Sequence, residues 1–163
     1  MSAAKRIKIV AIGDGNVGKT SMLISYSTGE IPEDYVPTVF DNFRTQINTS
    51  HGEITLDIWD TAGQEEYAEI RKLAFNNVDV FLVCFSIGNP TSLENLESKW
   101  INDVAESESP GAKVGWAHTV VPTSRRLVLL SLSRLLTIVA NAPIPLGDYL
   151  RHEKRFAIRH RRY

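Results

Sequence analysis

Cysteine is nearly absent from the sequence: Cys84 is the one thiol among 163 residues. A single thiol cannot form an internal disulfide, which excludes a secreted fold stapled by disulfides. Long apolar runs are also missing, and none approaches the roughly 18 residues that a membrane-spanning helix needs. Lys8 interrupts the apolar run that follows the basic start, so no signal peptide is predicted. We therefore expect a protein of a reducing, cytoplasmic compartment.

The remaining composition is that of a globular domain, with 43% hydrophobic and 23% charged residues. The charge, however, is unevenly distributed along the chain. Residues 1–110 carry a net charge of −9, and residues 111–163 carry one of +8. Such an asymmetry indicates two regions with different roles or origins. We expect a folded domain over residues 5–110 and a divergent basic segment over residues 111–163.

Strands and helices are predicted to alternate through the first of these regions. A helix is expected over Ser21–Ser27, with Met22, Leu23 and Tyr26 on one face, and a polar loop over Thr28–Pro37. This alternation favours an α/β fold with a largely parallel sheet. The expected strands are residues 7–12, 39–49, 53–59 and 78–86, of which the middle two form a hairpin.

A later helix is predicted from a capping motif and from apolar spacing. Thr91–Glu94 has the form of a capping box, in which a threonine and a glutamate three residues apart close the first turn. Apolar residues then follow at helical spacing, which predicts one buried helix face. Gly115–His118, by contrast, shows no clear period. The apolar residues of that face are Leu93, Leu96, Trp100, Ile101 and Val104.

The strongest motif lies between the first strand and the first helix. Residues 13–20 read Gly-Asp-Gly-Asn-Val-Gly-Lys-Thr and match the phosphate-binding pattern G-x-x-x-x-G-K-[ST]. Glycines let backbone N–H groups converge on phosphate oxygens, and the helix that follows adds a favourable dipole. Lys19 is expected to reach the β- and γ-phosphates, and the Thr20 hydroxyl is expected to bind Mg²⁺.

A second segment supports this interpretation. Asp60 ends the strand expected over residues 53–59 and is followed by Thr-Ala-Gly63-Gln64. A carboxylate at a strand end beside a phosphate loop can hold Mg²⁺. Gly63 can bring its N–H close to a γ-phosphate, and Gln64 can orient an attacking water. Alone, Asp60 would be read as a turn residue, but beside Lys19 and Thr20 the magnesium interpretation is favoured.

Three segments together resemble the Rho family of Ras-like small GTPases. They are the phosphate loop, Tyr35-Val-Pro-Thr-Val-Phe-Asp-Asn-Phe43 and Asp60-Thr-Ala-Gly-Gln-Glu-Glu-Tyr67, and similarity extends over about residues 5–108. The resemblance implies a P-loop NTPase fold of the Ras-like α/β type, with a largely parallel sheet flanked by helices. It also implies GTP or GDP as the bound nucleotide, Mg²⁺ as the cofactor, GTP hydrolysis, and a role in signalling to the actin cytoskeleton.

The same resemblance assigns roles to residues. Lys19 and Gln64 match the catalytic pair, and Thr20, Thr38 and Asp60 match the magnesium ligands. Tyr35 matches the aromatic that covers the nucleotide. The remaining nucleotide-binding positions are Gly13, Asp14, Gly15, Asn16, Val17, Gly18, Ser21 and Gly63. The positions read by effectors are Val39, Phe40, Asp41 and Asn42. Rho-type exchange factors and GTPase-activating proteins are the other implied partners, and one of the latter supplies the arginine finger.

The chain also departs from this family at two places. Ile31 stands where the family has a phenylalanine that packs against guanine, which predicts a looser base clamp or a tolerated variant. The Asn/Thr-Lys-x-Asp motif, whose aspartate reads guanine, does not occur after Lys113. Losing its two charge-assisted hydrogen bonds would cost about 10²–10⁴ in affinity. We expect the family's C-terminal strand and helices to be missing or replaced.

The basic segment lacks the family's lipidation signal, because the chain ends Arg-His-Arg-Arg-Tyr163 and carries no C-a-a-X box. No prenyl anchor is therefore expected. Weak peripheral contact with anionic lipid is one alternative, and a solvated charge run is the favoured one. No nucleic-acid partner is expected, since no RNA-binding motif accompanies the basic residues. A shifted reading frame, a retained intron or a genuine divergence would each explain the abrupt change.

Two functions remain open from the sequence. The first is a Rho-type molecular switch that binds GTP and Mg²⁺ and hydrolyses GTP. The alternative is a truncated GTPase-like protein with impaired guanine binding, which acts as an effector-binding module or has no function. Bound nucleotide on the purified protein would separate these alternatives.

Overall fold

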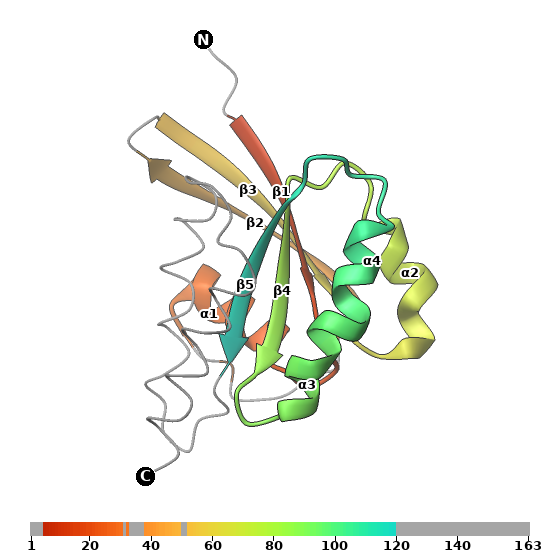
Figure 1. Ribbon diagram of the computed structural model, residues 1–163. Coiled ribbons are helices and arrows are strands. Elements are labelled where there is room, and N and C mark those ends of the chain that lie inside the picture. Colours follow the sequence, from red (N-terminus) through yellow and green to blue (C-terminus); the bar gives the residue numbers. More distant parts are fainter. Residues whose placement is uncertain (1–4, 31, 33–37, 50–51, 120–163) are drawn as a thin grey trace.

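The computed structural model describes residues 5–30, 32, 38–49 and 52–119 (Figure 1). Its five strands form one sheet in the order β2-β3-β1-β4-β5. The pair β2–β3 is antiparallel, and the other neighbours are parallel. The strands are β1 (Lys5–Ile12), β2 (Phe40–Thr49), β3 (Gly52–Thr61), β4 (Val80–Ser86) and β5 (Lys113–Thr119).

Helices cover both faces of this sheet. α1 (Lys19–Thr28) lies on one face, and α2 (Ala68–Leu73), α3 (Pro90–Asn95) and α4 (Ile101–Ala105) lie on the other (Figure 1). A 3₁₀ turn, Glu65–Tyr67, leads into α2. A π-helix, Leu96–Trp100, joins α3 to α4 so that the three form one continuous helical rod. The described residues therefore form a three-layer α/β unit.

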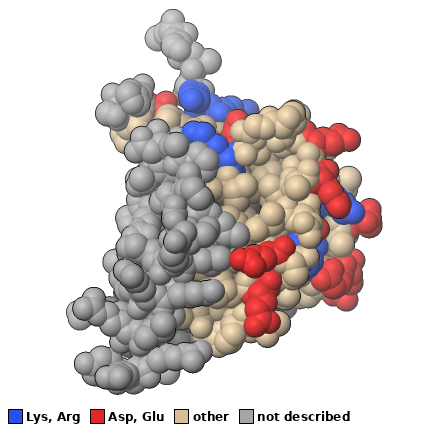
Figure 2. Space-filling model, in the orientation of Figure 1, with Lys and Arg blue, Asp and Glu red and all other residues tan. Residues whose placement is uncertain are grey.

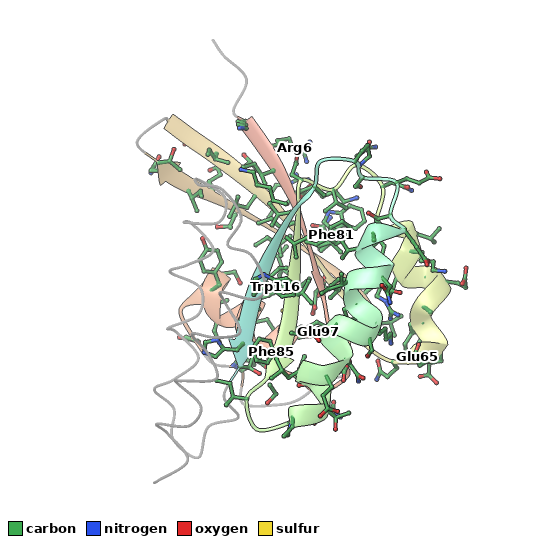
Figure 3. All side chains as sticks on the ribbon, viewed as in Figure 1. Arg6, Glu65, Phe81, Phe85, Glu97 and Trp116 are labelled. Carbon is green, nitrogen blue, oxygen red and sulfur yellow. The ribbon has the colours of Figure 1, made fainter. Side chains whose placement is uncertain are left out.

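Strand β4 is buried on both faces, as its apolar run predicts. Val80, Leu82 and Cys84 pack on the α1 side, whereas alternate residues such as Phe81 and Phe85 pack on the side of α2–α4 (Figure 3). This period of two follows from the pleat of a strand. Burial raises the pKa of the Cys84 thiol to about 12, because the thiolate would lose its hydration inside the core.

The expected alternation of strands and helices is confirmed, including the β2–β3 hairpin and the buried face of α1 formed by Met22 and Leu23. The predicted capping box is wrong. The helix begins at Pro90 with Asn89 as its N-cap, so Thr91 lies inside the first turn. Proline is favoured there because its fixed φ suits a helix start.

Strand β5 extends the sheet beyond the expected domain boundary at residue 110. Its seven residues pair in parallel with β4, from Val80 opposite Lys113 to Ser86 opposite Thr119. The irregular Gly115–His118 segment is thus part of the sheet, and Trp116 is buried against the helices of the second face. Residues 120–163 lie outside the described part of the chain, so the replacement of the family's C-terminal strand and helices stays a prediction.

The surface of the helical layer formed by α2, α3 and α4 is strongly acidic. Figure 2 shows Asp and Glu side chains gathered on the side where α2–α4 lie, with basic ones near the start of β1. The exposed acidic residues of that side include Glu65, Glu66, Glu69, Glu94, Glu97 and Glu106. In the described ranges, no helix has the length and hydrophobicity required to cross a membrane.

Candidate nucleotide-binding site

The phosphate loop, defined here as Gly13–Thr20, connects the carboxyl end of β1 to the first turn of α1. Gly18 is the N-cap of α1 and has a φ of 86°, a left-handed conformation that side chains rarely adopt. The Gly18 carbonyl accepts a hydrogen bond from Met22 N at 2.9 Å, which starts the helix. Backbone N–H groups at such a helix start are unpaired within the helix and favour anions.

Lys19 is buried inside the curve of this loop and is only 6% exposed. Its Nζ donates hydrogen bonds to the carbonyls of Gly13 and Asp14, each at 2.8 Å. Burial lowers the pKa of Lys19, since the ammonium has left water. The ammonium is thus held at the centre of the phosphate loop by two neutral carbonyls. A phosphate oxygen bound there would neutralise its positive charge.

Thr20, Thr38 and Asp60 converge at the start of α1 from three separate segments. Thr20 Oγ1 donates to Asp60 Oδ2 at 2.5 Å and lies 2.8 Å from Thr38 Oγ1. Asp60 is fully buried as the penultimate residue of β3, one residue before the strand end rather than after it. Burial raises the pKa of Asp60, an effect opposed by the hydrogen bond from Thr20 and by the charge of Lys19.

These three side chains fit a magnesium ion. Asp60 Oδ1 is buried and has no hydrogen-bond partner among the residues that the structure describes. Mg²⁺ prefers oxygen ligands, commonly one or two carboxylates together with hydroxyl, water and phosphate oxygens. A cation beside Asp60 would also offset the cost of burying its charge. Within the described ranges, no group of three His, Cys, Asp or Glu side chains offers a rival metal site.

Gly63 and Gln64 lie against the phosphate loop. A Cβ added at Gly63 would sit 2.3 Å from Gly15 N and 2.4 Å from the Gly13 carbonyl oxygen, so only glycine fits there. A Cβ added at Gly15 would lie 3.7 Å from Gln64 Cγ, which places the glutamine side chain over the loop. The absence of a side chain at Gly15 therefore leaves room for Gln64, and the catalytic role of Gln64 stays a prediction.

Asp14 faces away from the phosphate side of the loop. Its carboxylate accepts hydrogen bonds from Asn95 Nδ2 and Trp100 Nε1, both at 2.7 Å. Both donors belong to the α3–α4 rod on the far side of the sheet. The Asp14 carbonyl, by contrast, accepts a hydrogen bond from Lys19 Nζ at 2.8 Å.

The other predicted nucleotide-binding residues take different positions. Asn16 is exposed and has a φ of 60° at the tip of the loop. Val17 is buried in the core beside α1, and its carbonyl accepts a hydrogen bond from Thr119 Oγ1. Ser21 lies in the first turn of α1, where its carbonyl accepts a bond from Ser25. Tyr35 lies outside the described residues.

The predicted effector-binding residues are Val39, which precedes β2, and the first three residues of that strand. Val39 and Phe40 are 44% and 39% exposed, which is unusual for large apolar side chains. The Phe40 ring meets the Trp59 ring edge to face at a centroid distance of 5.3 Å. Asp41 and Asn42 are exposed beside them. The four residues thus form one continuous accessible segment that leads into β2, as an interaction surface requires.

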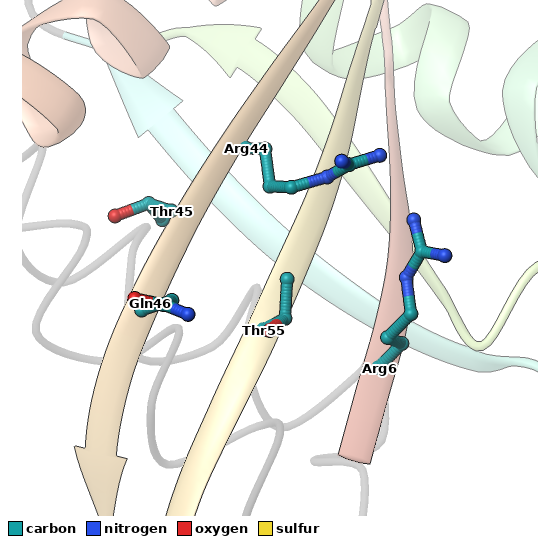
Figure 4. Close-up of a pocket in the computed structure, with 5 residues that line it drawn as sticks. All are labelled: Arg6, Arg44, Thr45, Gln46 and Thr55. Atoms are coloured by element: carbon teal, nitrogen blue, oxygen red, sulfur yellow. The ribbon is translucent and has the colours of Figure 1, made fainter. Parts of the chain in front are cut away.

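A hollow of about 600 Å³ lies at the opposite end of the strands and is separate from the phosphate loop (Figure 4). Arg6 of β1 and Arg44 of β2 both pair with Asp57 of β3, at 3.1 and 3.2 Å. Thr45, Gln46 and Thr55 line the rest of this hollow. Arg6 lies near the start of β1, and the phosphate loop follows the other end of that strand. The hollow therefore belongs to the outer sheet surface and not to the nucleotide site.

Sequence reasoning missed four residues that contact the site. Thr119 at the end of β5 donates to the Val17 carbonyl, and Gly18 packs against its methyl group. Arg71 is 2% exposed and donates to the Ala62 and Gln64 carbonyls at 2.7 and 3.3 Å. The apolar spacing of the later helix identified Trp100 as a core residue but not as a partner of Asp14. The fourth missed residue is Asn95.

Comparison with known proteins agrees with this geometry. The Ras family profile matches residues 8–117, from β1 into β5. The chain is 53% identical over 100 residues to the GTP-binding protein RHO4 of Eremothecium gossypii. It is 52% identical over 99 residues to the protein of the same name from Saccharomyces cerevisiae. These matches cover 61% and 60% of the chain but only 39% and 34% of the two relatives.

Proposed function

The chain belongs to the Ras family and is similar to its Rho-type members, and on this premise we propose that it binds a guanine nucleotide with Mg²⁺ and hydrolyses GTP to GDP and phosphate. The observation that carries the proposal is the convergence of Lys19, Thr20, Thr38 and Asp60 around the phosphate loop. We propose that this cycle serves as a molecular switch in signal transduction.

Each residue of the site has a task in this chemistry. The loop N–H groups and Lys19 would bind the phosphates and offset the charge that develops during transfer. Thr20, Thr38 and Asp60 would hold Mg²⁺, which supplies charge neutralisation between the phosphates when it is bound. Gln64, which lies over Gly15, would orient the attacking water. Lys19 and Asp60 are both buried and hydrogen-bonded, which fixes these two charged groups before the reaction.

The experiment is direct. The full chain is purified, its bound nucleotide is extracted and identified, and the rates of nucleotide release and of single-turnover GTP hydrolysis are measured with and without Mg²⁺. We expect a guanine nucleotide in stoichiometric amount and Mg²⁺-dependent hydrolysis. A folded chain that carries no nucleotide and binds none at millimolar GTP would overturn the proposal.

A second candidate function is favoured by one observation from the sequence. The residues after β5, Val120-Val-Pro-Thr123, do not form the guanine-reading motif of the family. A chain that held guanine poorly would still present the exposed Val39 and Phe40 to effectors. Such a protein would bind Rho-type effectors or regulators without turnover. Effector capture by nucleotide-free protein, at the same affinity as with GTP, would favour this candidate.

We propose Rho-type effectors, exchange factors and GTPase-activating proteins as partners, and a cytoplasmic location with weak peripheral membrane contact. Cell fractionation together with flotation on vesicles of neutral and of anionic lipid tests the location. Stable flotation with neutral vesicles would contradict it.

A further inference from the structure

Both carboxylate oxygens of Asp14 are bound to the α3–α4 rod. Oδ2 accepts from Asn95 Nδ2 and Oδ1 accepts from Trp100 Nε1, each at 2.7 Å, across 81 and 86 residues of sequence. The carbonyl of the same residue accepts from Lys19 Nζ at 2.8 Å. Asp14 therefore joins the ammonium group at the centre of the phosphate loop to a helix that contributes no other predicted site residue.

A π-helix makes this double contact geometrically possible. Ile101 N–H donates to the Leu96 carbonyl five residues earlier, so the turn that ends at Trp100 is wider than an α-helical turn. In an α-helix, residues five apart point about 140° apart around the axis, because each residue adds about 100°. A turn closed by bonds five residues apart brings them closer to alignment. Asn95 and Trp100 consequently reach one carboxylate, and such π turns recur at functional sites.

The indole ring of Trp100 contacts a second part of the site. Trp100 is fully buried, and the Arg71 guanidinium carbon lies 4.7 Å from its ring centroid. Arg71 in turn donates to the carbonyls of Ala62 and Gln64. A guanidinium held over an aromatic face is attracted by the ring and has a restricted position. The ring thus positions the cation that holds the backbone of Gln64.

Lys99, the residue before Trp100, is a second cation that lies over the Trp100 ring and binds the segment after β3. Its Nζ lies 4.2 Å from the Trp100 ring centroid and pairs with the Glu65 carboxylate at the start of the 3₁₀ turn. The hydrogen bond from Lys99 lowers the pKa of Glu65. Two cations over one ring therefore hold two consecutive residues, Gln64 and Glu65.

We propose that Trp100 is a positioning residue for hydrolysis: its N–H fixes Asp14 of the phosphate loop while its ring fixes Arg71 and, through it, Gln64. The proposal rests on the proposed GTPase function and deepens it, because it assigns to the α3–α4 rod the task of setting the water-orienting side chain against the phosphates. Trp100 contacts no reacting atom itself. It sets the position of the phosphate loop relative to Gln64.

The first test is structural and needs no turnover. Trp100→Phe keeps an aromatic ring but removes the N–H that binds Asp14. Trp59→Phe is the matched control, because the buried Trp59 Nε1 has no hydrogen-bond partner among the described residues. Hydrogen–deuterium exchange of the full chain is followed by mass spectrometry. In Trp100→Phe we expect about tenfold faster exchange in both the phosphate loop and residues 62–67, and in the control no change in either.

The second test is kinetic. We expect Trp100→Phe to lower the single-turnover rate of GTP hydrolysis about tenfold while GTP affinity stays within about threefold. Because Trp100 acts through Gln64, the double variant Trp100→Phe with Gln64→Leu should be no slower than Gln64→Leu alone. A merely structural loss would instead slow both backgrounds equally. Melting temperatures identify any variant that is not folded.

The outcomes separate the two proposals. An active parent together with an unchanged exchange pattern in Trp100→Phe would overturn the role of Trp100 and leave the GTPase function intact. An inactive parent whose two segments respond together to Trp100→Phe would overturn the GTPase function and leave the coupling intact. Should Trp100→Phe not fold, Asn95→Ala removes the other donor to Asp14 and is expected to act in the same direction with a smaller effect. An unchanged exchange pattern in Asn95→Ala would then overturn the coupling.

Discussion

Thr20 and Asp60 are 40 residues apart in the sequence and meet through a hydrogen bond of 2.5 Å. This bond joins the first turn of α1 to the end of β3 and leaves Asp60 Oδ1 buried without a partner in the described structure. The pair therefore presents a hydroxyl and a free carboxylate oxygen to the same point. This arrangement, together with the loop around Lys19, leads to the predictions that follow.

Thr20→Val should abolish the dependence of nucleotide binding on Mg²⁺. Valine has the shape of threonine but lacks the hydroxyl, and one hydrogen bond to a charged group is worth about 1.5–3 kcal/mol, or about tenfold or more in affinity. Nucleotide release, measured with Mg²⁺ and with EDTA, should be equally fast in the variant. Thr45→Val on β2 serves as the control. A variant that releases nucleotide slowly in Mg²⁺ would remove Thr20 from the metal site.

Lys19→Ala should eliminate measurable nucleotide binding. The substitution removes the buried cation and leaves the carbonyls of Gly13 and Asp14 to face the phosphates alone. Isothermal titration with GTP and with GDP is the measurement. Lys72→Ala removes an exposed lysine of α2 and should bind like the parent. Parent-like affinity in Lys19→Ala would mean that the phosphate-loop assignment is wrong.

Gln64→Leu should retain nucleotide affinity and slow single-turnover GTP hydrolysis by about 10²-fold, because misplacing a reacting group costs that order of rate. The side chain is exposed and lies beside Gly15, so leucine can occupy the same space. Gln46→Leu, an exposed glutamine on β2, should hydrolyse GTP at the parent rate. Equal rates for parent and Gln64→Leu would exclude this glutamine from the mechanism.

ATP and GTP should compete within about tenfold, a difference below about 1.4 kcal/mol. On the proposed function, residues between Gly13 and Gln64 would bind the phosphates and Mg²⁺ without distinguishing the bases, and the sequence after β5 lacks the family's guanine-reading aspartate motif. Competition binding on protein shown to be folded by circular dichroism is the test. A strong preference for GTP would mean that residues 120–163 supply a base-reading group of another kind.

Alkaline pH should destabilise the fold through Cys84. Its pKa is raised from 9.0 to about 12, so the folded state keeps the proton that the unfolded state releases above about pH 9. The stabilisation is thus complete below pH 9 and is lost at about 1.4 kcal/mol per pH unit between about 9 and 12. In urea unfolding at pH 8.5 and 10, the parent should lose about 1 kcal/mol more than Cys84→Ala. Equal losses would contradict the burial of the thiol.

The sequence predicted the local elements well because their signals are local. The alternation along β3 and the spacing of Met22 and Leu23 in α1 each follow from burial of one face of the element. The apolar run of β4 follows from burial of both faces of that strand. The phosphate loop and Asp60 were found for the same reason, since each is a short motif beside a strand. Gln64 follows Asp60 in the same motif, resemblance to one family adds Thr38, and the structure brings both residues to the same loop.

The features that sequence reasoning missed depend on partners far away in the chain. Strand β5 has no period of its own and is defined by its pairing with β4. Thr91 was expected to cap a helix, but the preceding proline begins the helix and Ser92 turns its hydroxyl to the Asn89 carbonyl at 2.7 Å. Asp14 is expected only as a nucleotide-binding position of the loop, and no local pattern shows that a π turn places two donors behind its carboxylate.

The contact of Gly63 with the backbone of Gly13–Gly15 has a consequence for conformational entropy. Two loops that touch through their main chains cannot be ordered separately, so their positions amount to one degree of freedom rather than two. A ligand that orders the phosphate loop also orders the start of the Gln64 segment, and the entropy of fixing both is lost in a single step. On the proposed function, nucleotide binding would then also fix the position of Gln64, and a side chain at residue 63 would uncouple these two steps.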